Sequence, residues 1–276
     1  MLSKPSITRM CLIMTAGGMW LAPHAIDRLS AVCAMLGTTF TVAAANALNM
    51  WWERDIDGLM KRTADRPLPT GRMAPKSALR FGLIMSVIGC VILALGTNLL
   101  TAGLGLFAIL SYVLVYTPMK RVTASSVFVG AIPGAMPPLM GWTAASNNLE
   151  APGLILFGIL LIWQIPHFLA ISIFRREEYE KAGIIVAPSS WGMGWTKFHT
   201  IFWSAVLVPV SVLLTPAGTT GAFYAITAAI AGVAFLGFAL MALWTTRLNR
   251  WAQWLFYASL AYLPLVTFAL VIDQTL

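Results

Sequence analysis

The chain has 276 residues, of which 59% are hydrophobic and only 10% are charged, and its mean hydropathy is +0.80. Soluble domains carry about 25% charged residues, so this composition excludes a water-soluble globular protein and indicates a polytopic membrane protein. The formal net charge of +8 could suggest nucleic-acid binding, but the placement of the basic residues explains it through membrane topology and excludes nucleic acid as a partner.

A transmembrane helix needs about 20 mostly apolar residues to cross roughly 30 Å of hydrocarbon. The sequence contains a series of such runs, which predict an all-α membrane helix bundle with about nine transmembrane helices in one integral-membrane domain, 1–276. The predicted spans lie near 8–25, 31–51, 79–97, 100–117, 124–143, 152–174, 199–216, 220–244 and 253–272.

The basic residues set the orientation of these spans. If the N-terminus is cytoplasmic, every Lys and Arg of the 18 except Arg28 lies in or beside a cytoplasmic segment. Cytoplasmic loops are the ones enriched in Lys and Arg, so the sequence favours this orientation. The long loops near 52–78 and 175–198 are then cytoplasmic.

Acidic residues also gather in these two loops, which the topology rule does not require. Seven of the ten Asp and Glu residues are found there. The first group is Glu53, Asp55, Asp57 and Asp65, and the second is Glu177, Glu178 and Glu180.

Asn49, Glu53 and Asp57 follow one another at four-residue intervals. On a helix continuing out of the second span they share one face, whereas Asp55 points elsewhere. Amide and carboxylate oxygens without His or Cys suit a hard cation such as magnesium. The spacing therefore predicts a metal-binding face.

Basic residues surround both acidic groups: Lys61, Arg62, Arg66, Lys120, Arg121, Arg175 and Arg176. Carboxylates that hold magnesium beside guanidinium groups are what a diphosphate requires. Each basic residue taken singly is also explained by the topology rule alone.

Four segments carry a resemblance to a known family: "NMWWERDIDGLMKRTADRPLPTG" (49–71), "YTPMKRVT" (116–123), "WQIPHFLAISIFRREEYEKAGI" (163–184) and "KPSITRMCLIMTAGGMWLAP" (4–23). Together they resemble the UbiA superfamily of membrane prenyltransferases, in the form found in its heme O synthase branch. The likeness runs through essentially the whole chain in order. It departs from the family at Glu178, where Asp is usual, and in the stretch 184–192.

The resemblance implies transfer of a farnesyl group from farnesyl diphosphate to a vinyl group of heme b, giving heme O and diphosphate. Heme b is then a substrate rather than a cofactor. The resemblance implies Mg²⁺ (or Mn²⁺) held by the catalytic residues Asn49, Glu53, Asp57 and Glu178. It implies diphosphate binding by Arg62, Arg66, Lys120 and Arg121.

Three further residues are candidates for substrate contact. His167 lies within the sixth span, and an ionisable group there is a functional hypothesis by default. It could ligate the heme iron, orient substrate, or hydrogen-bond a neighbouring helix. Tyr116 and Tyr179 adjoin the charged loops and could contact diphosphate, although Tyr is also common at membrane interfaces.

Two other functions remain open at this point. One is a different UbiA-type prenyltransferase with an aromatic acceptor, and the other is a secondary transporter, whose ionisable groups would lie near the membrane midplane. Apart from the lipid bilayer, the resemblance implies a heme A synthase or terminal oxidase assembly as partner, and a bacterial plasma (inner) membrane as location.

Overall fold

A computed structural model describes residues 2, 4–23 and 25–273, and within them the chain forms helices and turns but no strand. The long helices are α1 (Pro5–Leu21), α2 (Arg28–Trp52), α4 (Pro75–Gly96), α5 (Leu99–Leu110), α7 (Ser126–Ser146), α8 (Ala151–Phe174), α11 (Gly192–Val212), α12 (Ala222–Leu240) and α13 (Leu248–Asp273). Short elements are α3 (Arg54–Asp57), the π-helical turn η1 (Ser111–Tyr116), α6 (Thr117–Met119), α9 (Arg176–Lys181), α10 (Ala187–Ser190) and the 3₁₀ turn η2 (Met241–Leu243). The all-α prediction is confirmed for this part of the chain.

Each predicted span overlaps one long helix in the described residues, with α5 continuing through η1 into α6. Position 24, near the predicted end of the first span, lies outside those residues. In the described part of the chain, six helical segments are long and apolar enough to cross a membrane: Arg28–Trp52, Pro75–Gly96, Leu99–Met119, Ala151–Phe174, Ala222–Leu243 and Leu248–Asp273. A multi-pass membrane protein is therefore supported, while the count of nine spans stays a prediction.

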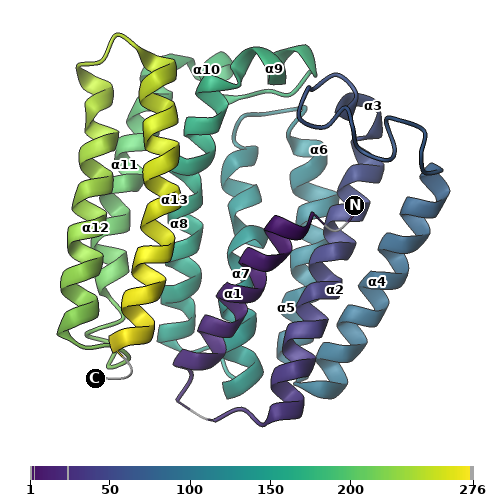
Figure 1. Cartoon of the computed structure of the whole chain (residues 1–276), viewed down its shortest axis with the longest axis vertical. Coiled ribbons are helices and arrows are strands. Elements are labelled where there is room, and N and C mark those ends of the chain that lie inside the picture. Colours follow the sequence, from purple (N-terminus) through teal and green to yellow (C-terminus); the bar gives the residue numbers. More distant parts are fainter. Residues whose placement is uncertain (1, 3, 24, 274–276) are drawn as a thin grey trace.

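The helices form two groups with α1 and α7 between them (Figure 1). Helices α2, α4 and α5 lie on one side, and α8, α11, α12 and α13 on the other. The short helices α3, α9 and α10 all lie at the upper end of the bundle in this view (Figure 1). The two acidic loops, which are separated by more than 100 residues in the sequence, therefore meet at one end of the molecule.

The outer surface of the bundle is apolar. Along α4, Val87 and Leu95 are 64% and 84% exposed, and along α12, Ile230 is 65% exposed. Such a surface would be unfavourable in water but is suited to lipid tails, which do not compete for hydrogen bonds. The interior face of α2 has instead small and polar side chains, among them Ala44, Ala47, Asn46 and Asn49.

Helices α1 and α7 approach each other closely because each presents a glycine at the crossing. A Cβ atom built on Gly18 would lie 2.0 Å from the carbonyl oxygen of Pro138, and one on Gly141 would lie 2.0 Å from that of Thr15. Small residues at such crossings let membrane helices pack backbone to backbone. The crossing fixes α1, and with it the N-terminal segment, against the rest of the bundle.

We therefore expect Gly18→Ala to lower stability by about 1–3 kcal/mol, because the new methyl group must force two backbones apart. The neighbouring Gly17 is the matched control, since a Cβ there meets nothing within 4 Å. Gly17→Ala should leave stability unchanged or raise it slightly through helix propensity. Thermal unfolding in detergent compares the two variants, and equal midpoints would contradict the close-packed crossing.

Candidate active site

The helix breaks within the first acidic segment, but Asn49, Glu53 and Asp57 still lie on one face. Helix α2 ends at Trp52, Glu53 leaves the helical conformation with φ −93° and ψ 9°, and α3 begins at Arg54. The backbone bonds from Glu53 N to Asn49 O and from Asp57 N to Glu53 O, both 2.9 Å, carry the four-residue spacing across the break. The predicted shared face of these three residues is confirmed.

This face is buried, which the sequence did not indicate. Asn49, Glu53 and Asp57 are 1%, 5% and 0% exposed. Buried carboxylates require counter-charges, and both have one. Arg66 Nη1 donates to both Asp57 oxygens at 2.7 and 2.6 Å, and Lys120 forms an ion pair with Glu53 Oε1.

The amide of Asn49 joins the Glu53 carboxylate to the turn after the fourth span. Its Nδ2 donates to Glu53 Oε2 at 2.9 Å and to Thr117 Oγ1 at 3.1 Å. Thr117 Oγ1 in turn donates to the carbonyl of Tyr112 at 2.7 Å, across the π-helical turn η1. Wide π turns are frequent at functional sites because they redirect side chains. Here the turn brings Thr117 to α2.

Tyr116 and Lys120 lie beside this network. The ammonium of Lys120 is 4.9 Å from the centre of the Tyr116 ring, a cation–π contact. A Cβ on Gly130 of α7 would fall 2.5 Å from that ring, so the absence of a side chain at Gly130 makes room for it. The structure thus brings Tyr116 and Lys120 to the predicted face.

The second acidic segment reaches the first loop through Glu178. Its Oε1 accepts a hydrogen bond from the Arg62 backbone N–H at 3.2 Å, and its Oε2 accepts one from Arg175 Nη1 at 2.8 Å. The Ile185 backbone N–H also donates to the carbonyl of Lys120 at 2.9 Å. These bonds tie together the loops after the second, fourth and sixth spans.

Ionisation follows from burial and pairing. Burial raises the pKa of Asp57, against the lowering effect of its hydrogen bonds from Arg66. Partial burial would also raise the pKa of Glu178, but the hydrogen bonds from Arg175 and Arg62 outweigh it and lower that pKa. Burial raises the pKa of Tyr179. The hydrogen bond from Arg121 lowers the pKa of Asp55.

Lys4 is a site residue that the sequence analysis did not single out. Its Nζ donates to Asn49 Oδ1 at 3.4 Å. Burial, together with the charges of Arg66 and Lys120, lowers its pKa to about 7. In the sequence, Lys4 was only the first residue of the segment 4–23 that carries the family resemblance, and a basic residue before the first span, which the topology rule already explained.

Some predicted residues lie apart from the buried face. Arg121 pairs with Asp55 at 2.6 Å, and the side chain of Asp55 is 59% exposed. Tyr179 packs on a small apolar cluster between the two loops, beside Ile56 and Met60. The prediction that Asp55 points away from the face is confirmed.

His167 lies in a separate aromatic environment. Its Nδ1 is 2.7 Å from Ser259 Oγ on α13, and its ring stacks on Trp163 at 4.9 Å and packs against Phe256 at 5.0 Å. Of the roles left open, hydrogen bonding to a neighbouring helix is the one present in this structure. Contact with heme or its iron stays a prediction.

The donor set fits a magnesium ion. Magnesium usually takes one or two carboxylates and completes its octahedron with water and phosphate oxygens, and Glu53, Asp57 and Asn49 Oδ1 offer two carboxylates and an amide oxygen. Glu53 Oε1 is buried, and Lys120 is its ion-pair partner. Within the described residues, no three His, Cys, Asp or Glu side chains lie around one point that could hold a metal ion. Glu178 therefore does not lie beside the same metal position as Glu53 and Asp57.

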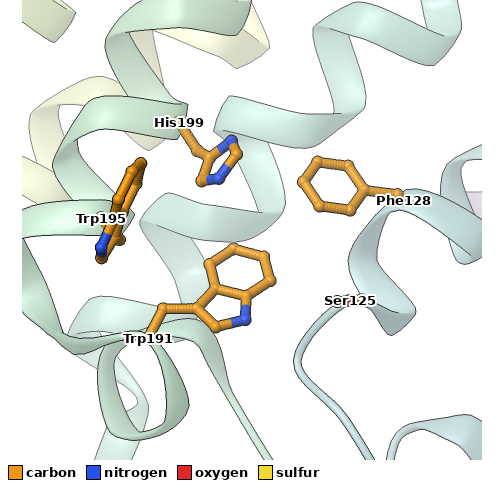
Figure 2. Close-up of a pocket in the computed structure, with 5 residues that line it drawn as sticks. All are labelled: Ser125, Phe128, Trp191, Trp195 and His199. Atoms are coloured by element: carbon orange, nitrogen blue, oxygen red, sulfur yellow. The ribbon is translucent and has the colours of Figure 1, made fainter.

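A different hollow, of about 500 Å³, lies between α7, α10 and α11. Figure 2 shows its lining: Ser125, Phe128, Trp191, Trp195 and His199. The ring centres of His199 and Trp191 are 5.1 Å apart. None of the residues predicted to bind metal or diphosphate lines it, so it is distinct from the site described above.

The protein is thus an all-helical membrane bundle with a buried carboxylate face and cations around it. Comparisons with known proteins identify its family. Residues 11–260 match the model of the UbiA prenyltransferase family. The chain is 44% identical over 273 residues to a protoheme IX farnesyltransferase of Myxococcus xanthus, covering 99% of this chain and 93% of that protein. It is 46% identical to that of Anaeromyxobacter dehalogenans, with 99% and 92% covered. The chain therefore belongs to the UbiA prenyltransferase family.

Solved structures share the fold. A digeranylgeranylglyceryl phosphate synthase structure superposes with a TM-score of 0.85 at 20% identity, covering 99% of this chain and 95% of that one. A UbiA homolog from Archaeoglobus fulgidus bound to DMAPP and Mg²⁺ has a TM-score of 0.69 at 15% identity, covering 95% and 98%. The family match confirms the prediction of a UbiA-type protein, and membership of a prenyltransferase family argues against the transporter alternative.

The two Arg–Asp pairs of the first loop should differ sharply in their effect on stability. Arg66→Ala leaves Asp57 buried without a partner, which we expect to cost about 3–5 kcal/mol. Arg121→Ala breaks an exposed pair and should cost about 0–1 kcal/mol. The double variant Arg66→Ala/Asp57→Ala should recover part of the loss. Thermal unfolding of the four proteins in one detergent tests this, and equal losses for both arginine variants would contradict it.

Proposed function

We propose that this protein transfers a farnesyl group from farnesyl diphosphate to a vinyl group of heme b, producing heme O and diphosphate. The observation that carries the proposal is the buried Asn49–Glu53–Asp57 face flanked by Arg66 and Lys120. Relatives at 44–46% identity over nearly the whole chain are protoheme IX farnesyltransferases. A fold neighbour is bound to an allylic diphosphate and Mg²⁺.

The residues of the face would have two different roles in the ionisation of farnesyl diphosphate. Asn49, Glu53 and Asp57 would hold Mg²⁺ (Mn²⁺ as a substitute), which neutralises the departing diphosphate when bound. The Arg66 and Lys120 side chains, held by Asp57 and Glu53, are preorganised donors beside that anion. Preorganised charge of this kind is commonly the largest single contribution to catalysis.

Further residues would complete diphosphate binding. The guanidinium of Arg62 makes no ion pair among the described residues, and its backbone is fixed by Glu178. Tyr116 lies under Lys120 and would support it. Arg121 and Tyr179, at the rim of the site, and Glu178, as a water-mediated or monodentate metal ligand, remain proposed members of the set.

Burial explains how the site could protect its intermediate. An allylic cation is quenched by water, and the nearly zero exposure of Asn49 and Asp57 means that water reaches this face poorly. The vinyl carbon of heme b would attack the cation, and water would then quench the adduct. His167 remains a proposed contact for heme.

The finer topology is part of the same proposal. We place one domain, 1–276, in a bacterial plasma membrane with nine spans, a cytoplasmic N-terminus and cytoplasmic loops near 52–78 and 175–198. The location of all Lys and Arg except Arg28 supports this orientation. Both substrates are apolar with an anionic end, which suits a site at the membrane edge. Heme A synthase or a terminal oxidase assembly is the proposed partner that takes up the product.

The proposed activity is tested by measuring heme O formation from heme b and farnesyl diphosphate by the purified protein. Removing divalent cation with EDTA should abolish the product, and added Mg²⁺ should restore it. Asp57→Asn should lower kcat by roughly 100-fold or more, because it removes a charge that binds metal and positions Arg66. The matched variant Asp55→Asn should stay within about threefold, since its pair with Arg121 is exposed. Absence of heme O from the unaltered protein would refute the proposal.

The second acidic group provides a separate prediction. Glu178→Gln should lower heme O formation about tenfold or more and raise the Mg²⁺ requirement, because the lost charge joins Arg175 to the Arg62 loop. Glu178→Asp should keep activity. Glu177→Gln and Glu180→Gln are the controls: Glu177 is exposed, and Glu180 pairs with Arg176 at the surface. Equal losses in all three Gln variants would mean that a diffuse negative patch, rather than Glu178, is required.

A further inference from the structure

The segment before α1 is attached to the bundle beside the carboxylate face. Leu2 is only 8% exposed and packs in an apolar cluster with Ala47 and Met50 of α2, Leu68 of the first loop and Ala78 of α4. Met50 directly follows Asn49, so this anchor lies next to the predicted metal ligands. The segment is therefore held at the site by apolar contacts of its own, independently of any charge.

Lys4, two residues after this anchor, is directed at the carboxylate face. Its ammonium donates to the Asn49 amide oxygen at 3.4 Å, a long contact with an acceptor that carries no charge. Three other cations around the site have carboxylate partners: Lys120 has Glu53, Arg66 has Asp57 and Arg175 has Glu178. In the described part of the chain, Lys4 makes no such ion pair.

The surroundings of Lys4 favour an additional anion. Arg66 and Lys120 lie close enough to repel it. Glu53 and Asp57 attract it, but these carboxylates are already paired with Lys120 and Arg66. A partly buried cation among cations is unfavourable unless an anion joins them. A diphosphate, with several negative oxygens in a small volume, supplies that charge at the point where these side chains converge.

We propose that Lys4 is a diphosphate-binding residue, delivered to the site by the N-terminal segment and held there by the Leu2 anchor. The inference rests on the proposed function, because it takes its ligand from that reaction. A cation bound by Asn49 Oδ1 would displace the ammonium from this oxygen and free its three donors for the phosphate oxygens. The α1 segment then contributes directly to the reaction rather than only to the bundle.

Binding of inorganic pyrophosphate in the presence of Mg²⁺, measured by calorimetry on the purified protein, tests this without catalysis. Lys4→Gln should weaken binding by roughly tenfold or more, because it removes a charge-assisted hydrogen bond. Lys4→Arg should keep most of the affinity. Arg9→Gln is the matched control, since it makes the same change in charge on an exposed part of α1 and should stay within about twofold.

The Leu2 anchor is tested in the same assay. Leu2→Ala should weaken pyrophosphate binding while Leu2→Met preserves it, because the first removes the packed side chain and the second conserves its volume. Thermal unfolding midpoints equal to that of the unaltered protein confirm that each variant is folded. Leu2→Ala binding at full affinity overturns the anchoring role.

The outcomes separate this inference from the proposed function. If the unaltered protein binds pyrophosphate and Lys4→Gln binds it equally well, the role of Lys4 is wrong and the farnesyl transfer proposal stands. If Lys4→Gln and Arg9→Gln lose affinity equally, general electrostatics explain the effect and the specific role is again wrong. If the unaltered protein does not bind Mg²⁺-pyrophosphate at all, the proposed function itself fails.

Discussion

Two carboxylates withdrawn from water impose the organisation of this site. Glu53 and Asp57 are 5% and 0% exposed, and an ionised carboxylate in such surroundings is strongly unfavourable without a positive partner. The partners come from other segments, Lys120 from the turn after α6 and Arg66 from the loop after α3. Removing one partner leaves a buried charge, so these segments must assemble together. The charged end of the bundle is in this sense a single unit.

Local irregularities in the helices give that unit its shape. The break at Glu53 ends α2 but keeps the four-residue spacing, so Asp57 remains on the face while Asp55 turns outward to Arg121. The π turn before Thr117 directs this hydroxyl to Asn49. A regular helix would not relate these side chains in the same way. The site thus depends on where the helices stop being regular.

The apolar composition has two roles in different parts of the molecule. On α4 and α12 large apolar side chains point outward, as a lipid-facing surface requires. At the crossing of α1 and α7, glycines stand in place of larger apolar side chains and let the two backbones come into contact. That crossing fixes the start of α1 near the carboxylate face, where Lys4 approaches Asn49. Helix packing in the membrane therefore determines which residues reach the site.

The sequence by itself determined the helical class, the positions of the long helices and the face shared by Asn49, Glu53 and Asp57. Hydrophobic runs of membrane length and a four-residue spacing of oxygen donors are local signals, because they depend only on residues close together in the sequence. It also separated Asp55 from Asp57 correctly. Tertiary structure alone decided that Asn49, Glu53 and Asp57 are buried, that Lys120 and Arg66 pair with them, and that His167 bonds to Ser259. It alone brought in Lys4. Burial and pairing depend on contacts between residues far apart in the chain, and the periodicity of one segment contains no information about its neighbours in space.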